Sequence, residues 1–128
     1  MCLLYLYYKY VVSFFQFQIE KKEDFVPACT CGDVKKVKSL IQKFSLDLNE
    51  GLNHAVKGGH YELIEFLIDQ GATNINQNIK TACENNNYFI TELLIQKGGK
   101  VEVGLRYSQS SNITKMLYRY KQKSEMIN

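Results

Sequence analysis

A period of 27 residues, the spacing of Ala28, Ala55 and Ala82, constrains the fold of this chain more than any other feature. After Ile95 the period shortens to 26 residues, the spacing of Ile79 and Leu105. A fixed period between about 20 and 50 residues is typical of chains built from stacked repeats. The aligned columns are Phe25, Leu52 and Ile79; Ala28, Ala55 and Ala82; Gly32, Gly59 and Asn86; Asp33, His60 and Asn87; Leu40, Leu67 and Leu94; and Ile41, Ile68 and Ile95.

Each column has a physical reason within a pair of short helices. The alanines allow two helices to approach closely, and glycine or asparagine follows where the chain reverses with positive φ. Asp33 and Asn87 precede the expected second helices, so their side-chain oxygens are predicted to cap them. His60 is a poorer cap, and the middle unit is predicted to depend more on packing. The leucine column is predicted to pack between neighbouring units, at about 2 kcal/mol for each fully buried side chain.

The middle unit resembles the ankyrin repeat. The residues that carry the resemblance are Leu52, Ala55, Gly59-His60, Leu63-Ile64, Phe66-Leu67 and Gly71-Ala72, and it extends over about residues 24–120. The family's Thr-Pro opening is replaced by Glu50-Gly51 and by Gln77-Asn78. Each unit is also about six residues shorter than the family's usual length of about 33. The shortening falls where the family carries its β-hairpin finger, so short loops are expected there. Shortened repeats rich in Asn and Lys look like those of large DNA viruses.

The resemblance implies an all-α, ankyrin-like helical-hairpin solenoid of about three and a half repeats with reduced β-hairpin fingers. The expected units are residues 25–49, 50–76, 77–101 and 102–121, between a non-repeat segment, 1–24, and a polar tail, 122–128. Pro27 is expected in the first turn of the first helix, where its missing N–H costs little. The last unit lacks about three residues before Leu117. A helical face of Ile113, Met116, Leu117 and Tyr120 still predicts a C-terminal cap with a polar outer side.

The first 19 residues are apolar and aromatic, and the polar run Glu20–Asp24 is predicted to mark their boundary with the first repeat. Leu4, Tyr8, Val11, Val12 and Phe15 fall at helical spacing, although the β-branched and aromatic content also suits a strand. The run is short for a membrane span, is interrupted by Lys9, and lacks the features of a signal peptide. The favoured interpretation is a cap on the first repeat. Membrane association and a poorly ordered extension are the alternatives.

The cysteines and histidines do not indicate a catalytic or metal-binding site. Cys29 and Cys83 share a column with Val56, which indicates small packed side chains rather than ligands. Cys29-Thr30-Cys31 is a weak metal motif, and neither a cofactor nor a disulfide framework is expected. His60 is predicted to be structural, as the family resemblance implies. No nucleophile, base and ligand set has usable spacing, so the chain is not expected to be an enzyme. Reduced thiols favour an intracellular, cytoplasmic location, in the host if the protein is viral.

The expected function is protein binding on the concave face of the repeat stack. The candidate contacts are the exposed positions of the first helices: Asn53, Lys57, Asn78, Lys80, Thr81, Glu84, Arg106 and Tyr107. The expected partner is another protein and the expected state a monomer, without a small-molecule substrate; a net charge of +3 favours no polyanion. One alternative is attachment to a membrane surface through residues 2–19. A second is weak nucleic-acid binding through Arg106, Arg119, Lys121 and Lys123 with Tyr107, Tyr118 and Tyr120.

Overall fold

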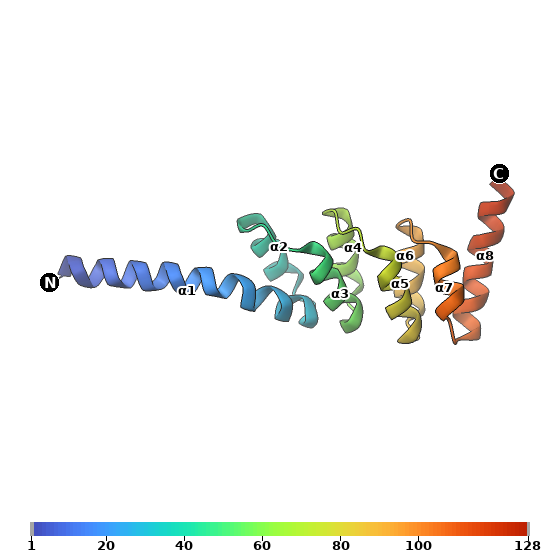
Figure 1. Ribbon diagram of the computed structural model, residues 1–128, viewed down its shortest axis with the longest axis horizontal. Helices are drawn as coiled ribbons and strands as arrows, with labels where there is room; N and C mark the ends of the chain where they lie inside the picture. Colours follow the sequence, from blue (N-terminus) through green and yellow to red (C-terminus); the bar gives the residue numbers. More distant parts are fainter. Residues whose placement is uncertain (1, 128) are drawn as a thin grey trace.

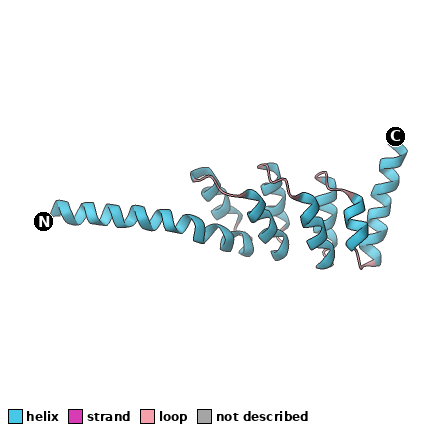
Figure 2. Cartoon of the chain, viewed as in Figure 1, coloured by secondary structure: helices cyan, strands magenta, loops and turns pink. Residues whose placement is uncertain are grey.

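The computed structural model describes the backbone of residues 2–127 and the side chains of residues 2–14 and 24–127. The described chain is entirely helical apart from turns and short connections, which confirms the all-α prediction (Figure 2). The helices are α1 (Cys2–Cys31), α2 (Val34–Lys43), α3 (Leu48–Gly58), α4 (Tyr61–Asp69), α5 (Ile75–Glu84), α6 (Tyr88–Gln96), α7 (Val101–Tyr107) and α8 (Ser111–Ile127).

The helices pack as successive pairs that lie side by side in a row (Figure 1). Within each pair, α1 contacts α2, α3 contacts α4, α5 contacts α6, and α7 contacts α8. Between pairs, α1, α3, α5 and α7 form one layer in which each helix contacts the next, and in a second layer α6 contacts both α4 and α8. The connections between pairs, residues 44–47, 70–74 and 97–100, are short and contain no strand.

Burial follows the alanine column throughout and the leucine column with one exception. Ala28, Ala55 and Ala82 are buried where helices approach closely. Leu67 and Leu94 are fully buried, as expected, whereas Leu40 is only half-buried. The reason is position: α2 belongs to the first pair, which has a neighbouring pair on one side only.

The turns inside the pairs have the predicted chemistry. Gly32, Gly59 and Asn86 all have positive φ, at 76°, 77° and 55°. The Lys36 amide donates to Asp33 Oδ1 at 3.0 Å, and the Ile90 amide donates to Asn87 Oδ1 at 3.2 Å, so both caps are confirmed. His60 precedes α4 without such a bond, which also agrees with the prediction.

The first helices begin slightly before the predicted unit boundaries at residues 50, 77 and 102. α3 begins at Leu48, α5 at Ile75 and α7 at Val101. For α3 the physical reason is Asp47, whose Oδ1 accepts from the amides of Asn49 at 2.9 Å and Glu50 at 3.3 Å. This side chain therefore starts the helix inside the stretch assigned to the preceding unit.

Helix α1 corrects two sequence expectations about the N-terminal region. It continues without a break through residues 20–24, which were expected to separate two segments. Pro27 consequently lies near the end of α1 and not in the first turn of a helix. The helix tolerates Pro27 because Phe25, Ala28 and Cys29 are buried beside it, while the proline ring itself is exposed.

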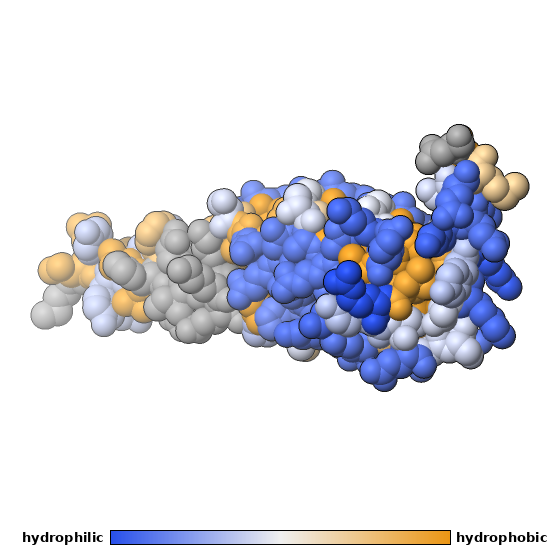
Figure 3. Space-filling model, turned by 45° about the vertical axis from the view of Figure 1, so that its right-hand side comes forward, coloured by the Kyte–Doolittle hydropathy of each residue, from blue (hydrophilic) through white to orange (hydrophobic). Residues whose placement is uncertain are grey.

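The predicted cap is not formed by residues 2–14. They are helical, which excludes the strand interpretation, and the helix projects away from the pairs (Figure 1). Leu3, Leu4 and Tyr10 are 84%, 75% and 78% exposed, and apolar atoms are visible at this end of the surface (Figure 3). α1 continues in one direction, so this part cannot fold back over the first pair. The side chains of residues 15–19 lie outside those described. Among residues 2–127, no helix is both long and apolar enough to cross a bilayer.

Candidate functional interface

The candidate interface is the outward side of the layer formed by α1, α3, α5 and α7, here called the first-helix face. Lys57, Lys80, Glu84 and Arg106 are exposed on these helices, and Thr81 and Tyr107 are half-buried. Lys80 and Arg106 occupy equivalent positions of α5 and α7, as do Thr81 and Tyr107. Because α5 packs directly on α7, these two columns form a continuous polar and aromatic surface.

On this face, the Lys80 side chain contacts those of Glu84 and Tyr107. Lys80 Nζ lies 3.9 Å from Glu84 Oε1, one turn along α5. It also lies 5.0 Å from the centre of the Tyr107 ring, across the junction with α7. Both contacts are solvent-exposed, so each contributes at most about 1 kcal/mol to stability. These groups can therefore exchange their present partners for those of another molecule at little cost.

Asn53 and Asn78 do not belong to the interface, contrary to the sequence prediction. Asn78 is 1% exposed, and its Nδ2 donates to Asn53 Oδ1 at 2.9 Å and to the Asn74 carbonyl at 3.0 Å. Asn53 is half-buried, and Asn74 Nδ2 also donates to its Oδ1, at 2.7 Å. Their side-chain amides form hydrogen bonds where α3 packs on α5. The sequence prediction missed this because spacing along a helix does not distinguish its exposed side from the side that packs on the next helix.

Two asparagines that sequence reasoning did not select hold successive pairs in register. Asn49 Oδ1 accepts from the Thr73 amide at 2.8 Å, and Asn76 Oδ1 accepts from the Lys100 amide at 2.8 Å. Asn49 and Asn76 are equivalent positions, so the same bond recurs one pair later. The available signal was the recurrence of Leu48-Asn49 as Ile75-Asn76 in the repeat. These side chains fix the spacing of successive helices in the first-helix face.

His60 is part of the packing between the first two pairs. Its Nε2 donates to the Thr30 carbonyl at 2.6 Å, because a carbonyl can only accept. A Cβ on Gly58 would lie 2.6 Å from the same ring, so the glycine is needed to accommodate it. His54 Nδ1 lies 3.4 Å from the Thr30 hydroxyl at the edge of the first-helix face. The structural role predicted for His60 is therefore confirmed.

The basic and aromatic C-terminal region presents little surface for stacking bases. Tyr120 is half-buried; its hydroxyl accepts from Gln96 Nε2 at 2.9 Å and donates to Glu92 Oε1 at 3.3 Å. Tyr107 is also half-buried beside Lys80, which leaves Tyr118, 53% exposed, as the accessible ring of the set. Ile113, Met116 and Leu117 are buried against the preceding helices, as the predicted apolar face requires.

The cysteines separate into two buried and two exposed thiols. Burial raises the pKa of Cys29 from its ordinary value of 9.0 to about 12, and the nearby Glu50 carboxylate adds to the shift. Burial also raises the pKa of Cys83. Cys2 and Cys31 are exposed. Within residues 2–127, no cluster of three or more His, Cys, Asp or Glu side chains could hold a metal ion.

Comparison with known proteins gave no match: neither a protein-family model nor a curated protein sequence matches this chain.

Proposed function

We propose that this chain is an ankyrin-like solenoid of about three and a half repeats that binds another protein on its first-helix face inside the cell. The observation that carries the proposal is the meeting of Lys80, Glu84 and Tyr107 across the α5–α7 junction. Arg106, the exposed residue directly before Tyr107 in α7, extends the same surface. Asn53 and Asn78 are removed from the proposed contacts because both are engaged between helices.

The composition of this surface suits a polypeptide partner. Tyr and Arg are enriched among the residues that dominate protein–protein binding energy. Both signs of charge are present, from Lys80, Arg106 and Glu84, which favours a partner with its own mixed surface over a uniform polyanion. The asparagine bonds between pairs keep the face preorganised, so little ordering entropy has to be lost on binding.

The proposal is tested by quantitative affinity purification with mass spectrometry of the full chain from cells that express it. The test variant combines Lys80→Ala, Arg106→Ala and Tyr107→Ala. The control variant combines Lys35→Ala, Tyr61→Ala and Lys100→Ala, which removes two positive charges and one tyrosine, as the test variant does, from exposed positions outside the first-helix face. Both variants must retain the helical circular dichroism of the wild type.

A specific partner should be lost with the test variant and kept with the control. Direct titration of that purified partner should then show binding weakened at least about tenfold, since loss of a central Tyr or Arg commonly costs 2 kcal/mol or more. Equal recovery of the partner with both variants would place its binding site elsewhere.

A second candidate function, attachment to a membrane surface, is supported by the exposure of residues 2–14. Large apolar and aromatic side chains occur all round this part of α1, and tyrosine is favoured at the membrane–water interface. The full chain should sediment together with vesicles of neutral phospholipid. A variant with Leu3, Leu4, Leu6 and Phe14 changed to Ser should stay in the supernatant. Equal sedimentation of the two proteins would reject this candidate.

A further inference from the structure

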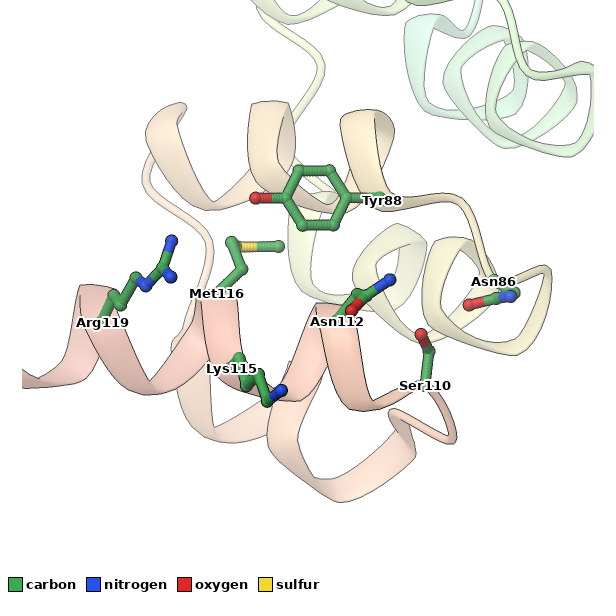
Figure 4. A pocket seen from close by; sticks show the side chains of 7 residues that line it. All are labelled: Asn86, Tyr88, Ser110, Asn112, Lys115, Met116 and Arg119. Carbon is green, nitrogen blue, oxygen red and sulfur yellow. The ribbon is translucent and has the colours of Figure 1, made fainter.

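A cavity of about 380 Å³ lies where the turn between α5 and α6 meets the beginning of α8. It is independent of the first-helix face, because its walls come from a turn and from the second layer of helices. Figure 4 shows Tyr88 on one side and the α8 side chains facing it on the other. The polar residues that line it are Asn86, Tyr88, Ser110, Asn112, Lys115 and Arg119.

The cavity occurs where a recurring side chain is too short to reach the preceding turn. His60, directly before α4, lies against the preceding turn, so closely that a Cβ on Gly32 would clash with its ring. Asn87, directly before α6, similarly lies against Gly59, at 3.6 Å from such a Cβ. The residue directly before α8 is Ser110, whose small side chain leaves space beside Asn86. The space is thus a consequence of a serine at the position where the two preceding pairs carry a larger side chain.

The lining carries positive charge without a carboxylate. Lys115 and Arg119 are exposed on successive turns of α8, four positions apart. Like charges at this spacing repel each other, which disfavours the empty site by a few tenths of a kcal/mol. Within residues 24–127, neither cation takes part in an ion pair of 4.0 Å or less. The Tyr88 hydroxyl points along the cavity toward the Arg119 end, and Asn112 lies toward the opposite end, on the side of Asn86 (Figure 4).

We propose that this cavity binds a phosphate group. Two cations match the charge of about −1.5 to −2 that a phosphate monoester carries at neutral pH. The hydroxyls of Tyr88 and Ser110 and the amide of Asn112 supply neutral donors for the remaining oxygens. The guanidinium of Arg119 can bind two phosphate oxygens at once, and Met116 forms an apolar part of the wall. The Ser110 and Asn112 end of the site lies at the first turn of α8, where the helix dipole adds to the attraction.

The test is a titration of the isotopically labelled full chain, followed by amide NMR shifts at constant ionic strength. The probes are inorganic phosphate, O-phospho-L-serine and acetate, each against sodium chloride. Phosphate and phosphoserine should shift the amides of Tyr88, Ser111 and Asn112, with acetate at least about tenfold weaker because it carries a single charge. Tighter binding of phosphoserine than of phosphate would assign the site to phosphorylated polypeptides, and the reverse order to the free ion.

The test variant is Lys115→Gln with Arg119→Gln, and the control is Lys35→Gln with Lys100→Gln. All four side chains are exposed, and both variants lose the same charge, so neither should affect folding. The test variant should bind phosphate at least about tenfold more weakly, and the control should bind like the wild type. Equal weakening in both variants, or shifts spread over all basic regions, would overturn the proposal. Neither outcome bears on protein binding at the first-helix face.

Discussion

Asn78 Nδ2, on α5, donates to Asn53 Oδ1, on α3, at 2.9 Å, in a position that is 1% exposed. Gly51 and Gly104 stand at the positions equivalent to Asn78 in α3 and α7. A Cβ on Gly51 would lie 2.7 Å from the Phe25 ring, and one on Gly104 would lie 2.9 Å from Leu117. The same column thus serves a polar bond between α3 and α5, close packing between α1 and α3, and close packing of α7 on α8 within the last pair.

Replacing the buried asparagine should destabilise the fold. Asn78→Ala removes the donor to Asn53 and to the Asn74 carbonyl and leaves a small cavity, so the free energy of unfolding should fall by about 1–3 kcal/mol. Urea denaturation followed by circular dichroism measures the change. Gln77→Ala, at the exposed neighbouring position, should stay within about 0.5 kcal/mol of the wild type. Equal stability of both variants would contradict a structural role for Asn78.

The close approach of α1 and α3 should be sensitive to a single methyl group. Gly51→Ala places a Cβ 2.7 Å from the Phe25 ring and 3.3 Å from Cys29 Sγ, so the helices must separate. We expect a loss of about 1–3 kcal/mol in the free energy of unfolding, as for other overpacked cores. Glu50→Ala is the adjacent control, because this side chain is exposed. A Gly51→Ala protein as stable as the wild type would show that this contact adjusts freely.

Thiol reactivity should divide the cysteines according to burial. Cys2 and Cys31 are exposed and should react rapidly with a disulfide reagent at pH 8, whereas Cys29 and Cys83 should react only after unfolding in urea. Mass spectrometry of the labelled peptides identifies the sites. Rapid modification of Cys29 in the native protein would mean that α1 separates readily from α3.

Alkaline pH should weaken the fold through the buried thiols. The pKa of Cys29 is raised to about 12 from 9.0, so above pH 9 the unfolded chain loses this proton while the folded chain keeps it. The folded state then binds more protons, and stability falls with rising pH, by at most about 1.4 kcal/mol per unit for this group, up to about pH 12. The shift of Cys83 acts in the same direction.

Cys29→Val isolates the contribution of this thiol, because Val56 occupies the same column in α3. Urea denaturation at pH 8, 9.5 and 10.5 should give a shallower fall in the free energy of unfolding for the variant than for the wild type. Identical slopes for the two proteins would exclude a role for Cys29 in the alkaline response.

Much of each helix pair could be predicted because its determinants are local. Asp33 and Asn87 cap the helices that follow them, and Asn86 takes positive φ, since these effects involve residues only a few positions apart. The interface residues were predicted less well. Spacing along one helix placed Asn78 beside Lys80 as a surface residue, but the angle at which α5 meets α3 buries the first and exposes the second.

The sequence by itself determined the succession of short helix pairs after α1, because the periodic alanines, turn residues and caps act within one pair. Only the tertiary structure decided which amides face the next pair, how far α1 projects and where the cavity beside α8 lies. These features depend on distances between helices that are far apart in sequence. A one-dimensional period records that units recur, but not which side of each unit meets its neighbour.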